Sequence, residues 1–242
     1  MYQHINKVFY VGTANKAYYE AFGLKASQLI FAPHAIDNDR FSQDRSIEVQ
    51  QLRKLLRVKA NEYLIVFAGK FEHKKDPEIL LNTFTELNNS HVHLLFVGNG
   101  ILEESLKNQR KTKNEQRTTN IHFMDFQNQS QMPVIYQACD LFCLPSKGPG
   151  ETWGLAVNEA MAAGKAILVS NRVGCAKDLV KEGLNGAIFE AGNMSSLKSK
   201  LTNLLEKPED LSEMGKQSAT EIKKWSIEKQ AEIIINELNA TH

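Results

Sequence analysis

One segment of the chain guides the interpretation of the rest: residues 144–164 read LPSKGPGETWGLAVNEAMAAG. An apolar run ends at Leu144, a glycine-rich loop follows, and a helical pattern begins near Gly154. Backbone amides at the start of a helix, together with the helix dipole, favour an anionic ligand. The order of strand, loop and helix therefore predicts a site for an anion at this turn.

Two carboxylates frame that helix start. Glu151 precedes the helix and Glu159 lies inside it. Their spacing corresponds to at most ~12 Å along a helix and to ~80° around it, so the pair shares a face but cannot hold one atom. Two separated acceptors suit an extended ligand with hydroxyl groups at both ends and an anionic middle, which is the layout of a sugar nucleotide. Small apolar residues surround Glu159, so it interrupts an otherwise buried face.

Short apolar runs alternate with helical patterns along the chain. This alternation is typical of a parallel sheet covered on both faces, with right-handed crossovers. The sequence predicts an α/β fold with a doubly wound, Rossmann-like parallel sheet, whose ligands bind outside the carboxyl ends of the strands. The expected strands are residues 8–11, 29–32, 63–68, 93–97, 121–124, 141–144 and 166–169, and the expected helices are 14–22, 77–87, 101–109, 132–138, 155–163 and 176–182.

The two ends of the chain differ from the centre. Residues 1–41 hold too few elements for a Rossmann-like domain, whereas residues 42–224 suffice for one. Beyond the last expected strand the pattern is helical, with breaks at Pro208 and just before Ser226, which is placed to cap a terminal helix within 225–242.

Composition excludes several classes of protein. The 242 residues include 29 Lys and Arg against 28 Asp and Glu, and 42% are hydrophobic. These values disfavour a disordered chain and a strongly basic nucleic-acid binder, so no nucleic-acid partner is expected. Apolar runs are far shorter than the ~20 residues that span a bilayer, and no signal-peptide pattern follows Met1. Cys139, Cys143 and Cys175 match neither a disulfide framework nor a zinc-ligand spacing, so we expect a reducing, cytoplasmic location.

The sequence gives little support for a metal site. Asp37 and Asp39 form a D-x-D triplet, but no apolar strand follows it, and the histidines lack metal-binding spacings. A basic cluster near a helix end favours a solvated face and leaves a peripheral contact with the inner membrane face open. That cluster consists of Arg53, Lys54, Arg57 and Lys59.

Two further loops follow expected strands. Gly69 and Lys70 share a loop with Lys75, where two cations could converge on a diphosphate, although a solvated basic loop explains the same residues. Asp76, just before a proline, is expected to cap the next helix.

Gly98, Asn99 and Gly100 follow the next expected strand and form a glycine turn. The dinucleotide fingerprint needs a third small residue where Glu103 stands, which disfavours NAD or FAD.

Together these features resemble the retaining glycosyltransferases of family 4, the group 1 glycosyl transferases, which have the GT-B fold of two facing Rossmann-like domains. The resemblance covers roughly residue 29 to the C-terminus, as the donor-binding domain of that family. The matching features are the E-x7-E pair with the preceding Pro145-Ser146, the basic loop from Gly69, the turn at Gly98, and residues 136–140.

The resemblance implies roles for individual residues. Lys70 and Lys75 would neutralise the donor diphosphate, and Glu151 would contact the sugar and stabilise charge at the reacting centre. Glu159 would hold the ribose, and Phe126 would lie beside the base. The other implied donor-binding residues are Gly69, Gly98, Asn99, Gly100, Thr152, Trp153, Gly154 and Leu155.

The implied function is retaining, metal-independent transfer of a sugar from a UDP- or GDP-sugar, with no cofactor besides the donor. Only residues 1–28 resemble the family's N-terminal, acceptor-binding domain, so we expect an acceptor-binding domain or subunit to complete the enzyme and little transfer without it. A non-catalytic nucleotide-sugar-binding or partner module remains an alternative. A related GT-B epimerase is a third interpretation, which the E-x7-E loop does not favour.

Overall fold

The computed structural model describes residues 2, 4–112, 120–148 and 150–240. Pro149 of the glycine-rich loop, residues 113–119 and the last two residues of the chain lie outside the described residues. The strands are β1 (Val8–Tyr10), β2 (Leu29–Phe31), β3 (Tyr63–Ala68), β4 (Val92–Val97), β5 (Ile121–Met124), β6 (Leu141–Leu144), β7 (Ala166–Ser170) and β8 (Gly186–Phe189). The helices are α1 (Thr13–Ala21), α2 (Asn38–Ser42), α3 (Ser46–Leu55), α4 (Pro77–Leu87), α5 (Glu103–Thr112), α7 (Met132–Ala138), α8 (Leu155–Ala162), α9 (Ala176–Leu179), α10 (Met194–Glu206), α11 (Asp210–Ile222) and α12 (Ile227–Ala240), with a 3₁₀ turn at Ala26–Gln28.

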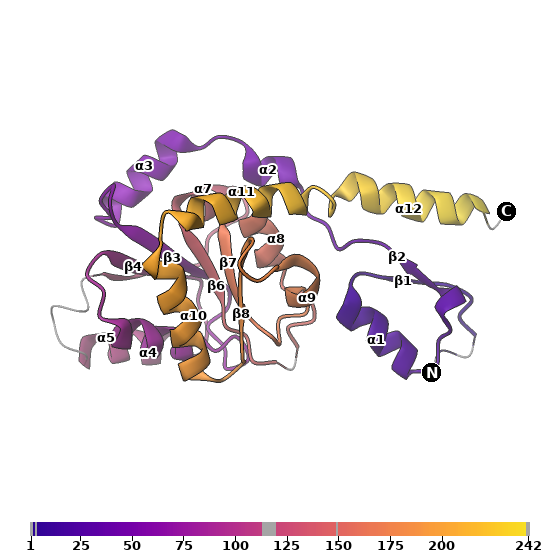
Figure 1. The fold of residues 1–242 in the computed structure, drawn as a ribbon, viewed down its shortest axis with the longest axis horizontal. Helices are drawn as coiled ribbons and strands as arrows, with labels where there is room; N and C mark the ends of the chain where they lie inside the picture. The colour runs from indigo at the N-terminus through magenta and orange to yellow at the C-terminus, as the bar shows by residue number, and fades with distance from the viewer. Residues whose placement is uncertain (1, 3, 113–119, 149, 241–242) are drawn as a thin grey trace.

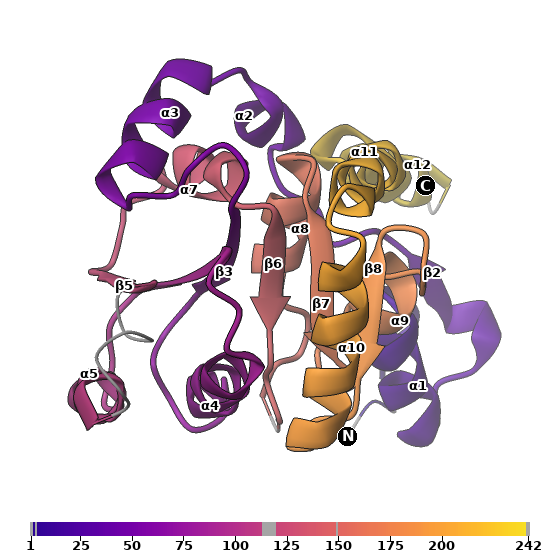
Figure 2. The same cartoon turned by 60° about the vertical axis from the view of Figure 1, so that its left-hand side comes forward.

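Parallel strands form the central six-stranded sheet, in the order β5-β4-β3-β6-β7-β8 (Figure 1). The chain extends the sheet from β3 to β5 on one side, then returns and extends it from β6 to β8 on the other. Helices α4, α5 and α10 cover one face; α7, α8 and α11 cover the other, with α2 and α3 outside them (Figure 2). The expected doubly wound, Rossmann-like sheet is confirmed.

The core lies between these layers. Strands β4, β6 and β7 are buried at every position, as expected for a parallel sheet with helices on both faces. Aromatic rings of Phe67, Phe71 and Phe96 pack together with centroids 5.7–6.2 Å apart, so Phe71 fixes the loop after β3 to the core. Burying each such side chain contributes roughly 1.5–3 kcal/mol.

The structure also contains elements that the sequence patterns did not indicate. β8 is four residues long and begins with Gly186, which gives it little strand signal. The glycine is needed because a Cβ there would stand 1.9 Å from the Ile167 carbonyl oxygen. The sequence patterns indicated α3 only through the helix end expected near Arg53 and Lys54. Two predicted helix breaks are present: Pro208 separates α10 from α11, and the Ser226 hydroxyl accepts a hydrogen bond from the Lys229 amide at 3.2 Å at the start of α12.

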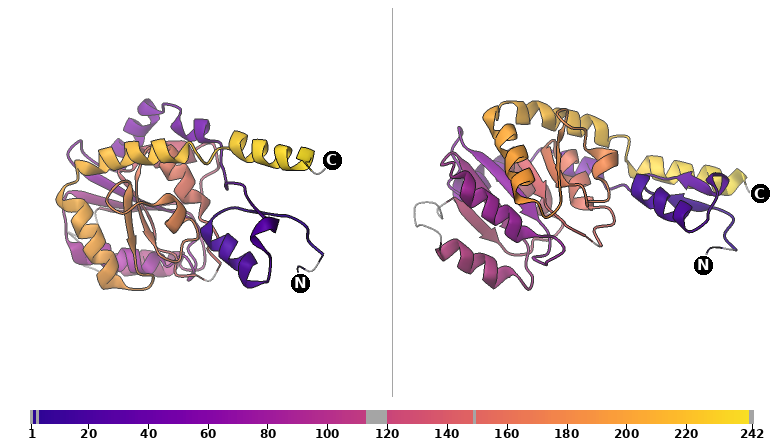
Figure 3. Two further views of the ribbon diagram at one scale, coloured as in Figure 1. Left: turned by 45° about the vertical axis from the view of Figure 1, so that its right-hand side comes forward. Right: turned by 60° about the horizontal axis from the view of Figure 1, so that its bottom comes forward.

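The N-terminal segment lies beside α12, away from the central sheet. β1 and β2 pair in a separate parallel sheet, and α12 runs next to them (Figure 3). An ion pair of 3.0 Å joins Lys7 to Glu237. In the described part of the chain, α1 and α12 bury none of their residues, and Phe22 and Ile235 are more than half exposed. No helix among the described residues is both long enough and apolar enough to cross a bilayer.

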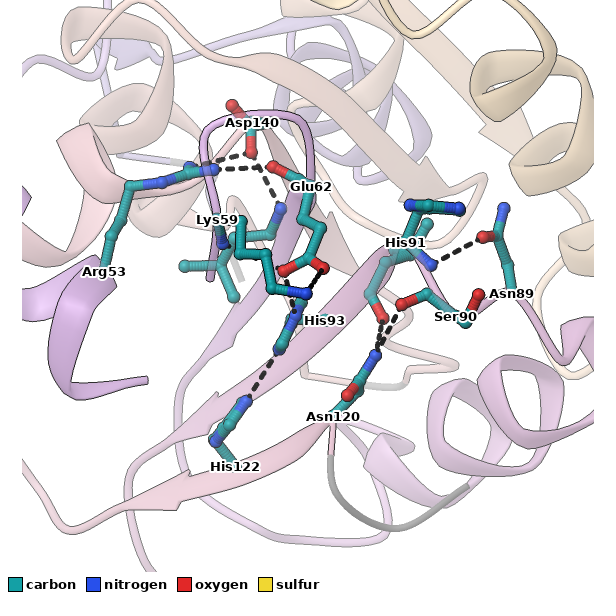
Figure 4. Close-up of polar contacts among 12 residues, drawn as sticks. Arg53, Lys59, Glu62, Asn89, Ser90, His91, His93, Asn120, His122 and Asp140 are labelled. Atoms are coloured by element: carbon teal, nitrogen blue, oxygen red, sulfur yellow. Dashed lines mark hydrogen bonds and ion pairs between the residues drawn. The ribbon is translucent and has the colours of Figure 1, made fainter. Parts of the chain in front are cut away.

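A buried polar cluster lies at the amino-terminal edge of the sheet (Figure 4). Nε2 of His93 in β4 lies 3.1 Å from Glu62, and its Nδ1 lies 3.0 Å from Nε2 of His122. The rings of His93 and His122 are stacked. Because a carboxylate only accepts, Nε2 of neutral His93 donates to Glu62 and its Nδ1 accepts from His122. Hydrogen bonding by the Lys59 amide lowers the pKa of Glu62 to about 2, whereas burial lowers the pKa of His122 to about 4 and also lowers that of His93.

Acid should therefore destabilise this protein before its carboxylates are protonated. Between pH 6.5, the ordinary histidine pKa, and about 4, the unfolded chain binds more protons than the folded one at His122, so the free energy of unfolding falls as the pH drops. The contribution of Glu62 is lost only below its ordinary pKa of 4.5. Because His122→Gln retains a group that can hydrogen-bond His93 but does not titrate, we expect this variant to lose less stability than wild type between pH 7 and 5 in urea unfolding.

His91→Gln is the matched control, since exposed His91 lies outside the Glu62–His93–His122 chain (Figure 4). It should follow the wild-type pH dependence. An identical pH dependence in His122→Gln and wild type would contradict the assignment.

Candidate functional site

The candidate site is a pocket of about 360 Å³ at the point where the strand order of the sheet reverses, between β3 and β6. Such switch points are the usual ligand sites of doubly wound sheets. Loops after β3, β4 and β5 and the start of α8 surround it. The lining residues are Ala68, Gly69, Lys70, Lys75, Val97, Gly98, Asn99, Phe126, Gln127, Gln129, Met132, Tyr136, Leu155, Ala156 and Glu159.

Glycines bring two of these loops into contact. Gly98 has φ of 136°, and a Cβ on it would stand 2.1 Å from the Gly69 carbonyl oxygen. The amide of Phe71 donates to the Asn99 carbonyl at 2.8 Å. These contacts fix the loops after β3 and β4 against one another and form the floor of the pocket. Gly100 is needed beneath this floor, where a Cβ would meet the Phe71 backbone at 2.6 Å.

An ion pair between Lys75 and Glu151 connects the loop after β3 to the loop after β6. Lys75 Nζ contacts Glu151 Oε2, which also accepts from the Ser146 hydroxyl at 2.8 Å. The Lys75 side chain is 18% exposed and that of Glu151 is 9% exposed. A partly buried carboxylate in this position requires the cation, because an unpaired buried charge is costly.

The other cations of the site are more exposed. The Lys70 side chain is 76% exposed and its Nζ lies 4.0 Å from Glu72, which Lys74 approaches to 3.4 Å. Lys147 pairs with Asp76 at 3.1 Å. Lys70 is therefore the pocket cation that is held most loosely by its own protein.

The expectation that Asp76 caps α4 is wrong. Its side chain makes no hydrogen bond to the helix and pairs with Lys147 instead. Asp76 occupies the left-handed region with φ of 51°, which removes the extended backbone geometry that a capping side chain normally uses. Proline at the first turn of α4 agrees with the sequence expectation.

Glu159 projects from α8 into the opposite wall of the pocket. The Tyr136 hydroxyl donates to Glu159 Oε2 at 2.7 Å. Burial raises the pKa of Glu159, while hydrogen bonds from Tyr136 and Gln129 and the charge of Arg40 act in the other direction. Burial also raises the pKa of Tyr136 well above its ordinary value, so this phenol stays protonated and donates.

Several predicted residues lie outside the pocket lining, among them Glu151 and Gly100. Thr152 and Trp153 belong to the turn between Glu151 and α8, and Gly154 forms its end with φ of 99°. The buried indole of Trp153 donates to Asn158 at 2.9 Å and packs on Trp225, away from the pocket. Leu155 does line the pocket, as does Ala156, so the first turn of α8 borders it.

Sequence reasoning did not select Gln129, Met132 and Tyr136 as lining residues. They come from the segment after β5 and from α7, which forms the wall facing α8. A usable signal existed for Tyr136, because it places a hydroxyl among the apolar side chains of a buried helix, where such a group needs a partner. Gln129 stands in an exposed polar loop, where no sequence pattern distinguishes it from its neighbours.

Among the described residues, no group of three or more His, Cys, Asp or Glu side chains is arranged to hold a metal ion. The positively charged groups at the pocket are Lys70 and Lys75, and the N-terminal end of the α8 dipole adds a partial positive potential beside them. This set can bind an anion, and Glu159 adds an acceptor for hydroxyl groups at one wall.

Known proteins share this fold and sequence pattern. The family model for glycosyl transferases group 1 matches residues 48–221. An uncharacterised glycosyltransferase of Methanocaldococcus jannaschii is 25% identical over 164 residues, which is 68% of this chain and 44% of that protein. Spore coat protein SA of Bacillus subtilis is 28% identical over 65% of this chain and 43% of its own length. The chain thus spans less than half of these curated relatives.

Solved structures give the same fold. The Anabaena HepE structure in complex with UDP aligns with a TM-score of 0.83 and 19% identity, over 97% of this chain and 64% of that one. A sucrose-phosphate synthase from Thermosynechococcus elongatus aligns with a TM-score of 0.79 and 20% identity, over 97% of this chain and 59% of that one. Because the family model matches well over half of its residues, the chain belongs to the group 1 glycosyl transferases.

Proposed function

We propose that this chain is the donor-binding part of a retaining, metal-independent glycosyltransferase that uses a UDP- or GDP-sugar. The observation that carries the proposal is the pocket itself, which is lined by Lys70 and Lys75, by the first turn of α8 and by Glu159. A nucleoside diphosphate has the matching groups, with an anionic diphosphate next to a ribose diol.

We extend the proposal to the remaining parts of the donor with the roles that the family resemblance implies. Phe126 is 69% exposed at the pocket and offers an aromatic face to the base. Lys70 and the first amides of α8 would bind the diphosphate, and Glu151 would face the sugar. In transfer, the bond from the anomeric carbon to the diphosphate breaks and the diphosphate takes the electron pair. The acceptor hydroxyl forms the new bond on the same face and passes its proton to an oxygen of the departing diphosphate, while Lys70 and Lys75 stabilise the charge that develops there.

Transfer also requires an acceptor site, and we propose that a further domain or subunit provides it. The exposed apolar side chains of α1 and α12 support a contact there, because such surfaces on neighbouring elements are typical of interaction sites.

A peripheral membrane contact has weaker support. Arg53 pairs with Asp140 and Lys59 with Glu62, so two of the four basic side chains already have intramolecular partners.

Direct titration tests donor binding. Calorimetry of the folded chain with UDP, GDP and their sugar conjugates should show saturable binding of one nucleotide class, with little sugar transfer to added acceptors. A folded chain, verified by circular dichroism, that binds neither class would contradict the proposal.

Lys70→Met should separate diphosphate binding from nucleoside binding. Losing one charge-assisted contact should weaken UDP or GDP about tenfold and leave the affinity for the free nucleoside unchanged. Lys216→Met removes a comparably exposed lysine from α11 and is the control. Wild-type affinity for the diphosphate in Lys70→Met would refute the role of Lys70.

Lys75→Met should instead reduce stability. The change leaves Glu151 largely buried without its cation, and we expect a loss of about 2–4 kcal/mol in the free energy of unfolding. Lys70→Met is the internal comparison and should stay within about 0.5 kcal/mol of wild type, since its side chain is mostly exposed. Urea unfolding measures both, and equal stabilities of the two variants would show that the Lys75–Glu151 pair does not hold the site.

A further inference from the structure

Glu159 is held in place by residues from three other elements. On one side, Tyr136 of α7 donates its hydroxyl to Glu159 Oε2 at 2.7 Å. Tyr136 is 1% exposed, and its ring packs against Phe41 and Phe142 with centroids 5.8 and 5.5 Å away. The phenol therefore has a fixed position, and so does the carboxylate oxygen that it contacts.

On the other side, a polar chain begins at Arg40 in α2. Arg40 Nη2 donates to both the backbone carbonyl and the side-chain oxygen of Gln129. With its oxygen held by the guanidinium, Gln129 can turn only its amide N–H groups toward Glu159, with which it hydrogen-bonds. Arg40 thus fixes the orientation of a side chain that has no burial to hold it.

The charged and titratable groups around Glu159 come from every neighbouring element. Arg40 lies on α2, Tyr136 on α7, and Lys70 and Lys75 on the loop after β3 that lines the same pocket. Burial favours the protonated carboxyl, whereas the two hydrogen bonds and the Arg40 charge favour the carboxylate. Because a carboxylate only accepts hydrogen bonds, the Glu159 lone pairs that face the pocket select ligand groups that donate.

We propose that Tyr136 and Gln129, the latter oriented by Arg40, are positioning residues that aim the Glu159 carboxylate at the ribose hydroxyls of the donor. The inference rests on the proposed function and deepens it. Tyr136 and Gln129 hold the carboxylate from within the protein, and the 2′- and 3′-hydroxyls complete its hydrogen bonds. The arrangement makes Glu159 a selector for ribose over deoxyribose.

Tyr136→Phe is the main test, because it keeps the ring in the core and removes the hydroxyl. Calorimetry should compare the nucleoside diphosphate that wild type binds, UDP or GDP, with its 2′-deoxy form. We expect the variant to bind the ribose form about tenfold more weakly and the 2′-deoxy form, which keeps only the 3′-hydroxyl, less so, and the preference for ribose therefore falls. A role confined to packing would weaken both ligands equally.

The pH dependence gives a second readout. Affinity for the ribose form requires the carboxylate and falls as the pH drops through the pKa of Glu159. Without the Tyr136 hydrogen bond that pKa rises further, so the midpoint of the loss should move to higher pH in Tyr136→Phe.

Two other variants keep the test decisive. Gln129→Leu changes an exposed residue, preserves the core, and should shift the ribose preference and the pH midpoint in the same direction but less. Tyr63→Phe removes a tyrosine hydroxyl at the opposite end of β3 and should change neither.

The outcomes separate the two proposals. A wild-type chain that binds no nucleoside diphosphate contradicts the proposed function. A wild-type chain that binds one but does not prefer ribose overturns the present inference. The inference also fails if Tyr136→Phe and Gln129→Leu keep the wild-type preference and pH midpoint.

Discussion

The separation of β3 from β6 is the constraint on which the site depends. The two strands pair at Ile65 with Leu141 and at Val66 with Phe142. Beyond these positions the pairing stops, although both strands continue for two more residues. Right-handed crossovers then connect β3 to β4 through α4 and β6 to β7 through α8, on opposite faces of the sheet. Neither crossover covers the opening between the strands. The pocket follows from this topology, and the residues of the adjoining loops determine what can bind in it.

Across this opening, the protein uses its two glutamates in different electrostatic states. Glu151 is neutralised by Lys75 and Ser146, and the Lys147 amide donates to the Lys74 carbonyl at 2.9 Å beside them, so the loops are tied together. Glu159 instead receives its hydrogen bonds from the neutral groups of Tyr136 and Gln129 and keeps its acceptor capacity. Under the proposed function, a bound diphosphate would compete with Glu151 for Lys75. Lys75 would then be needed both to bind the ligand and to hold Glu151 across the opening.

The sequence predicted the sheet because buried parallel strands are nearly continuous apolar runs. It singled out Glu159 because a charge interrupts a small, apolar helix, and the structure places that residue in the pocket wall beside Tyr136. It did not reveal β8, whose four residues begin with a glycine that close packing against β7 requires. Asp76 was misassigned because a left-handed backbone conformation cannot be read from residue type alone. The contrast between exposed Lys70 and paired Lys75 depends on Glu151, which is distant in sequence, so spacing could not distinguish them.

The turn that carries Glu151 also contacts the N-terminal segment, which is held in addition by Asp178 of α9, whose carboxylate accepts from the Thr13 amide at 3.0 Å. Trp153 packs on Trp225 at the start of α12, and a Cβ on Gly12 would stand 2.3 Å from its ring. Asn158 accepts from Trp153 and donates to the His34 carbonyl at 2.9 Å. Tightly packed interiors transmit displacements because they contain little free volume. A movement of residues 1–41 against the sheet must therefore displace Trp153, and with it the backbone that positions Glu151 at the sugar end of the proposed site.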